Sequence, residues 1–126
     1  MPLTDFTTLP DHARLWTFAA TRSLTDEESA PFLSATDGFL GGWSAHRVPL
    51  ATARDWRYDR FLFIAVDEKS AGASGCSIDA LVRFIRQAED SLGVALTDNR
   101  PVWFRNVAGE ICCESRERFK ALVMRG

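Results

Sequence analysis

The spacing of apolar residues predicts two amphipathic helices. Residues 78–92 are the clearer one, because charged residues alternate with an apolar stripe at helical spacing and Gly93 follows as a natural end. The stripe comprises Ile78, Leu81, Val82, Ile85, Ala88 and Leu92. The other helix spans Phe32 to Trp43, and Thr25-x-x-Glu28 before it is a capping-box pattern. Because proline lacks a backbone donor, Pro31 leaves Ser29 open as an alternative start.

Short runs rich in β-forming residues predict the strands. "RLWTFAAT" (14–21) is one, and "VPLATARDWRY" (48–58) has mixed polarity on both sides, which favours an outer strand. "FLFIAV" (61–66) has no polar residue on either side, so we expect it at the centre of a sheet. "PVWFRNV" (101–107) and "ICCE" (111–114) are further strands, and a short helix follows them.

The element order predicts an α+β fold. Strand, helix, strand, strand, helix, strand is the βαββαβ order of ferredoxin-like folds, in which two helices cover one face of an antiparallel sheet. We expect a single domain over residues 1–126, with an irregular lead-in at 1–13 and a C-terminal strand and helix at 108–126. Strand 61–66 places Phe61, Phe63 and Ala65 on one side and Leu62, Ile64 and Val66 on the other, and two helices can bury only one of these sets. A C-terminal segment, a ligand or another subunit should therefore cover the second sheet face. We expect a homodimer or a protein partner there.

Composition and charge argue against several classes of function. A net charge of −2 and no basic stripe argue against nucleic acid, although the aromatic residues of strands 14–21 and 61–66 loosely resemble an RNA-recognition motif. No apolar run is long enough to span a membrane. Three cysteines without an export signal predict a cytoplasmic protein with free thiols. Two histidines and no C-x-x-C predict no metal site, and no cofactor is expected.

The small-residue segment "SAGASGCS" (70–77) directly before the second helix is the best candidate site. Unpaired amides at a helix start attract anions, and small side chains let a ligand approach them. We expect Ser77 as the N-cap, Asp79 in the first turn and a positive φ at Gly75. The candidate residues for binding a small anion are Ser70, Ser74, Gly75, Ser77 and Asp79.

Cys76 suggests an alternative function for the same segment. A thiol just outside a helix N-terminus is a candidate nucleophile, and His46 could serve as its base. The segment could also be purely structural, with glycines for turning, serines for capping and Cys76 filling a small gap.

Two blocks of the sequence resemble a known family. Trp43-Ser-Ala-His46 and "AVDEKSAGASGCSIDALVRFI" (65–85) are similar to blocks of an uncharacterised bacterial family commonly labelled "ABC transporter ATPase". The label implies ATP hydrolysis, but the chain has no G-x-x-x-x-G-K-[ST] loop, so we do not expect an ATPase. The sequence therefore predicts a ligand-binding or protein-interaction module that uses the Ser70–Ser77 loop and the aromatic sheet face. A thiol-dependent enzyme with Cys76 and His46 is the alternative.

Overall fold

A three-stranded antiparallel sheet and two helices form the larger part of the molecule. The computed structural model describes residues 13–68, 72–98, 102–105 and 107–124. The chain separates into two compact units, residues 1–96 and 97–126. In the first unit the strands β1 (Arg14–Ala19), β4 (Ala51–Arg57) and β5 (Phe61–Asp67) pair in the order β1-β5-β4. The apolar strand β5 is central, as predicted.

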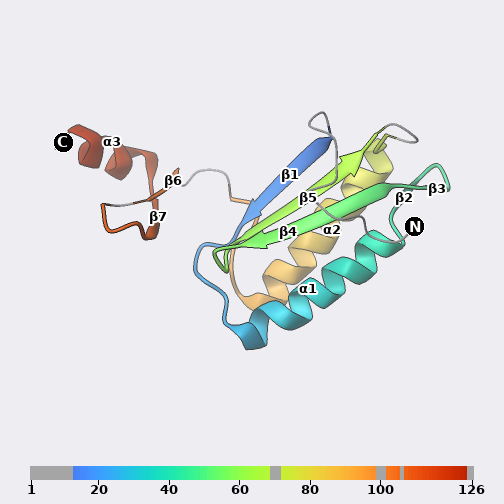
Figure 1. Ribbon diagram of the computed structural model, residues 1–126, viewed down its shortest axis with the longest axis horizontal. Helices are drawn as coiled ribbons and strands as arrows, with labels where there is room; N and C mark the ends of the chain where they lie inside the picture. The colour runs from blue at the N-terminus through green and yellow to red at the C-terminus, as the bar shows by residue number, and fades with distance from the viewer. Residues whose placement is uncertain (1–12, 69–71, 99–101, 106, 125–126) are drawn as a thin grey trace. The chain divides into compact units, whose positions relative to one another are not determined.

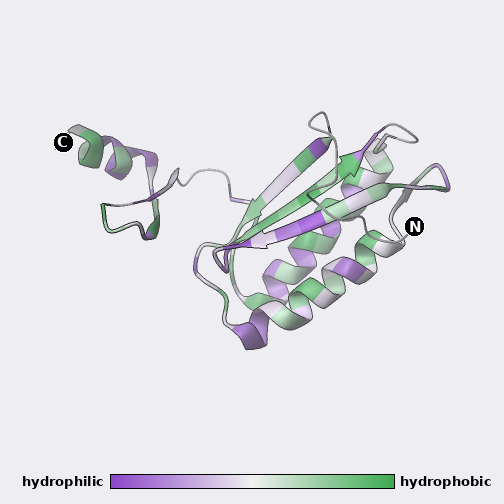
Figure 2. Cartoon of the chain, viewed as in Figure 1, coloured by the Kyte–Doolittle hydropathy of each residue, from purple (hydrophilic) through white to green (hydrophobic). Residues whose placement is uncertain are grey.

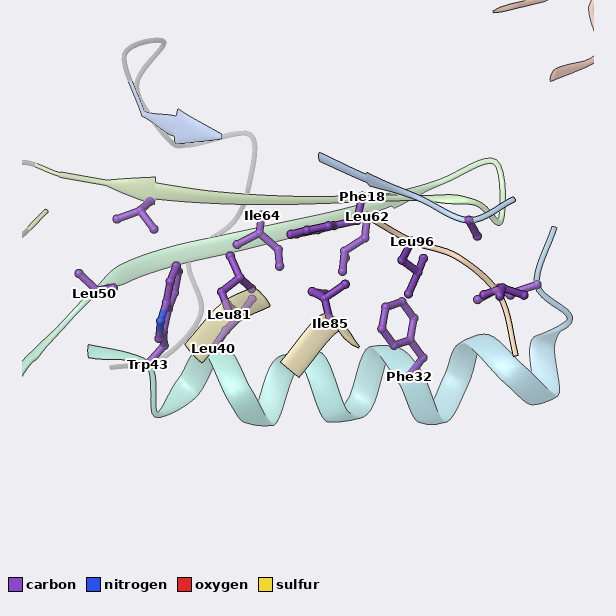
Figure 3. Close-up of a cluster of buried hydrophobic side chains, with 14 of the residues drawn as sticks. Phe18, Phe32, Leu40, Trp43, Leu50, Leu62, Ile64, Leu81, Ile85 and Leu96 are labelled. Carbon is purple, nitrogen blue, oxygen red and sulfur yellow. The ribbon is translucent and has the colours of Figure 1, made fainter. Parts of the chain in front are cut away.

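Helices α1 (Asp26–Gly41) and α2 (Gly75–Leu92) lie on the same face of this sheet (Figure 1). The register pairs Trp16 with Ile64 and Trp56 with Leu62, so these side chains point to the helical side. Figure 3 shows Leu62 and Ile64 of β5 directed toward labelled side chains of both helices, among them Phe32, Leu40, Leu81 and Ile85. The largest fully buried side chains of this core are Leu40, Leu50, Leu62, Ile64, Leu81, Ile85 and Leu96.

The other sheet face is less apolar than expected. Phe61 and Phe63 lie there half-buried, and Leu15 is 51% exposed, as the predicted alternation requires. However, β4 contributes Asp55 and Arg57 to this face, and their side chains form an ion pair at 2.6 Å. The Arg57 guanidinium lies 5.9 Å from the centre of the Phe63 ring. Figure 2 shows the resulting contrast between hydrophobic β5 and the hydrophilic section of β4. A charged pair beside the aromatic rings reduces the need for a cover over them.

The capping box predicted for α1 is confirmed. Thr25 is the N-cap, its hydroxyl accepts from the Glu28 amide, and the Glu28 carboxylate accepts from the Thr25 amide. The helix therefore begins at Asp26 and not at Ser29. Pro31 lies in the second helical turn, where its ring removes one backbone donor without ending the helix.

The four-stranded ferredoxin-like sheet is not confirmed. In the described residues the sheet of the first unit has three strands, and β6 (Val102–Arg105) pairs with β7 (Ile111–Glu114) in the second unit. The turn between β6 and β7 places Gly109 at φ 82°, which glycine adopts without strain. β6 and β7 are neighbours in the sequence, so their pairing closes only a short loop. Pairing of β6 with β1 would close a much longer loop, which costs more conformational entropy.

The second unit also contains α3 (Arg116–Met124). The Ser115 hydroxyl caps it by accepting from the Arg118 amide at 3.2 Å. Leu122 and Val123 are exposed, and Phe119 is half-buried. The predicted C-terminal strand and helix are therefore present, with an apolar stripe that stays largely open to solvent within this unit.

Candidate functional site

A hairpin that the sequence did not predict brings His46 to the start of α2. Strands β2 (Ser44–Ala45) and β3 (Val48–Pro49) pair antiparallel, and His46 and Arg47 form the two-residue turn between them. Their φ angles of 51° and 67° are those of a type I′ turn, which usually contains asparagine or glycine. Two bulky residues in this left-handed region are strained, so the hairpin holds them against their own backbone preference.

A hydrogen bond from Trp43 connects this hairpin to α2. Its side chain is 4% exposed, and its Nε1 donates to the Ser77 carbonyl oxygen at 2.8 Å. The ring also packs edge-on against Trp16, with the ring centres 5.7 Å apart. The Trp43 carbonyl accepts from the Leu50 amide, which continues the hairpin pairing. A buried indole therefore fixes the distance between the hairpin and the first turn of the helix.

The start of α2 differs from the prediction. Ser74, not Ser77, is the N-cap, and Gly75 is the first helical residue. Ser77 is the third helical residue and completes a reciprocal capping box, in which the Ser74 amide donates to its hydroxyl at 2.6 Å. Cys76 therefore lies inside the first turn and not before it. Gly75 does not have the positive φ that we expected.

Two other predicted site residues do not join this arrangement. Asp79 is exposed and lies beyond the first turn, which contains no acidic residue. Ser70 lies outside the described residues. Closer to the helix start, the Glu68 carboxylate accepts from the Ala73 amide at 3.0 Å, so this part of the loop already has an anionic partner.

The side chains of both capping-box serines form hydrogen bonds within the start of the helix. The Ser77 amide donates to the Ser74 hydroxyl, and the Ser77 hydroxyl donates to the Ser74 carbonyl oxygen at 2.8 Å. The Ile78 amide donates to the same carbonyl oxygen at 2.9 Å. Among the described residues, no hydrogen bond is found for the amides of Gly75 and Cys76. The hydroxyls of Ser74 and Ser77 are therefore already engaged, whereas these two backbone amides remain as donors.

His46 and Cys76 line one surface hollow of about 490 Å³. The thiol and the imidazole are both exposed. A Cβ added at Gly75 would meet no atom within 4 Å, so the space before the first turn is open. The remaining lining residues are Phe39, Gly42, Trp43, Ser44, Ser74, Ser77 and Ala80. The hollow thus combines an aromatic wall, a thiol, an imidazole and the positive end of an 18-residue helix.

A second hollow of about 500 Å³ lies between the outer sides of α1 and α2. Its lining is mainly apolar, including Phe84, Ala35 and Ala88, with Glu27 and Glu28 at the N-terminal end of α1. Phe84 stacks on Phe39, with the ring centres 4.8 Å apart. The lining of this hollow includes two carboxylates and no cationic side chain, so the hollow beside His46 is the better candidate for an anionic ligand.

The described residues contain no cluster of three or more histidine, cysteine or acidic side chains that could hold a metal ion. In the same part of the chain no helix is long and apolar enough to cross a membrane. Comparison of the chain with protein-family models, with curated proteins and with solved structures gave no match.

Proposed function

We propose that this domain binds a small anionic ligand, carrying a carboxylate or a phosphate group, in the hollow between the β2–β3 hairpin and the start of α2. One observation carries the proposal: His46 and Cys76 line one open hollow at the start of α2, where no hydrogen bond is found, among the described residues, for the amides of Gly75 and Cys76. The amides would donate to the anion, and the helix dipole would favour its charge. A protonated His46 would add a cation beside it.

The two sequence blocks with the family resemblance support this location. They provide Trp43 and His46 from one block and Ser74, Cys76 and Ser77 from the other, and all five line the hollow. The strained turn at His46 points the same way, because strained backbone in a fixed hairpin often marks a functional position.

Amide NMR spectra of the isotopically labelled chain, titrated with inorganic phosphate and with a dicarboxylate such as succinate, test the proposal. Saturable shifts of the Gly75 and Cys76 amides are expected, and His46→Asn should weaken them because asparagine keeps the turn but cannot become a cation. Arg83→Gln, on the exposed side of α2 outside the hollow, is the matched control that removes one cation. No shift at millimolar ligand, or equal weakening by both variants, would contradict the proposal.

A thiol-dependent enzyme is the second candidate, because the exposed Cys76 thiol shares the hollow with an imidazole. In such an enzyme His46 would accept the thiol proton and the thiolate would attack an electrophilic carbon. Iodoacetamide should then alkylate Cys76 far faster than Cys112 and Cys113, and His46→Asn should slow only Cys76. Equal alkylation rates for the three cysteines would exclude this function.

We also propose that the protein is cytoplasmic. Its support is that all three cysteines are free, including the neighbouring pair Cys112 and Cys113. Free thiols persist in a reducing compartment.

A further inference from the structure

The outer edge of β1 carries backbone groups for which no partner is found among the described residues. The Ala20 amide donates to the Arg60 carbonyl oxygen at 2.8 Å, on the side of β5. The next amide, that of Thr21, points the other way and donates to the Ala95 carbonyl oxygen at 3.2 Å. Because bonding direction alternates along an antiparallel strand, Leu15, Thr17 and Ala19 direct their amide and carbonyl groups away from β5. No partner for these groups is found in the described structure.

Nothing in the sequence of β1 protects this edge. Natural edge strands are usually blocked by a proline, a bulge or a central charge. The register of β1 with β5 is continuous from Arg14 to Ala19, and Arg14 at its first position is its only charged residue. Figure 2 shows the same pattern, with hydrophilic colour only at the N-terminal end of β1.

At the opposite edge of the sheet one backbone group is already occupied. On β4 the Trp56 amide donates to the Asp55 side chain at 2.9 Å, which occupies a group that a new strand would need. Arg54 on the same strand is held by Asp37 of α1 through two hydrogen bonds of 2.7 and 2.9 Å.

We propose that two copies of this chain pair antiparallel through their β1 edges. The free stretch consists of Leu15, Thr17 and Ala19, so its centre is Thr17. A two-fold axis through Thr17 pairs it with the partner's Thr17, and pairs Leu15 with the partner's Ala19. Each of these three positions then exchanges an amide and a carbonyl with the partner, so all six free groups are satisfied. The two Arg14 side chains lie at opposite ends of the new pair and do not repel each other.

A second copy fits this edge because the free stretch pairs with itself in antiparallel register about Thr17. The pairing joins two three-stranded sheets into a continuous sheet with α1 and α2 of both copies on one side. It also extends the half-exposed surface of Leu15 and Phe63 across the junction. The contact does not use the hollow beside His46, so it is independent of the proposed ligand site.

Charge substitutions at Thr17 test the pairing, because this exposed side chain faces its own copy across the axis. Sedimentation velocity of the wild-type chain at micromolar concentration should show a dimer. Thr17→Lys and Thr17→Glu should each give a monomer, since like charges would lie directly opposite. An equimolar mixture of the two variants should recover the dimer through opposite charges. Ser34→Lys and Ser34→Glu make the same changes on the exposed side of α1 and should leave the dimer intact.

Hydrogen exchange provides a second readout that does not depend on a variant folding. The Leu15, Thr17 and Ala19 amides should exchange slowly in the wild-type dimer and faster on dilution to monomer. A wild-type chain that is a monomer at micromolar concentration overturns the proposal, and so does a dimer that survives both Thr17 variants. Slow exchange of these amides in a monomer would also overturn it, because a segment of the same chain would then cover the edge.

Discussion

Two buried threonines test how hydrogen bonding of a buried hydroxyl affects stability, because one hydroxyl is hydrogen-bonded and the other is not. Thr52 on β4 and Thr36 on α1 are both 0% exposed. The Thr36 hydroxyl donates to the Phe32 carbonyl oxygen at 2.8 Å. The Thr52 hydroxyl oxygen is buried without a hydrogen-bond partner in the structure. Valine has nearly the shape of threonine, so Thr→Val at each site exchanges a hydroxyl for a methyl group with little change in packing.

The two substitutions should have opposite signs. A buried polar group without a partner costs about 1–3 kcal/mol, so Thr52→Val should raise the free energy of unfolding by about 1 kcal/mol or more. Thr36→Val removes a made hydrogen bond worth about 0.5–1.5 kcal/mol and should lower the free energy of unfolding by about 1 kcal/mol. The Phe32 carbonyl keeps its backbone donor within the helix, so no orphaned acceptor enlarges the loss.

Urea unfolding followed by tryptophan fluorescence and by circular dichroism measures both changes. Coincident transitions from the two probes and an unchanged denaturant slope are required before the midpoints are compared. The variants should differ from each other by about 2 kcal/mol. If Thr52→Val destabilises the chain as much as Thr36→Val, the Thr52 hydroxyl has a partner in solution and the reasoning fails.

Other predictions concern the helix start and the hairpin turn. The hydrogen bonds from Arg22 and then from Thr25 lower the pKa of Glu28 from 4.5 to about 2. The Glu28 carboxylate therefore stabilises the fold above pH 4.5, and this contribution is lost as the pH falls toward 2. In acid titrations of stability, the difference between the wild type and Glu28→Gln should vanish over this window; a constant difference would refute the role of the charge. Thr25→Ala should lower the free energy of unfolding by about 1 kcal/mol in urea, whereas no change would mean that the capping box contributes little. Arg47→Gly should raise it by about 1 kcal/mol because Arg47 has a φ of 67°, and a loss of stability would show that the side chain makes a compensating contact.

Local signals in the sequence were sufficient for the elements and for much of the fold class. Thr25 and Glu28 are three residues apart, so the α1 capping box needs no distant partner and was predicted correctly. The apolar run of β5 implied a central strand because a strand covered on both edges and one face tolerates few polar groups. Gly93 ends α2 in the left-handed conformation, with φ 68°, as its position after the stripe suggested.

The sequence alone was not sufficient to locate the first residue of α2. Ser74 and Ser77 are both good N-cap residues, and the sequence alone does not distinguish them. In the fold the Ser77 carbonyl oxygen accepts from the Trp43 indole and the residue is 4% exposed, which places it inside the helix. The cap then moves three residues back to Ser74, and Cys76 and Gly75 become helical with it.

The site and the free sheet edge were also decided by the three-dimensional fold. His46 and Cys76 were both candidates from their residue types, but they share a hollow only because the β2–β3 hairpin returns to the first turn of α2. The fourth strand expected in this sheet pairs instead with its neighbour along the chain, β7. Periodicity reports which face of a strand is apolar, because that depends on each residue's own side chain. Which strands share an edge depends on backbone groups that all residues have in common, so only the tertiary structure shows it.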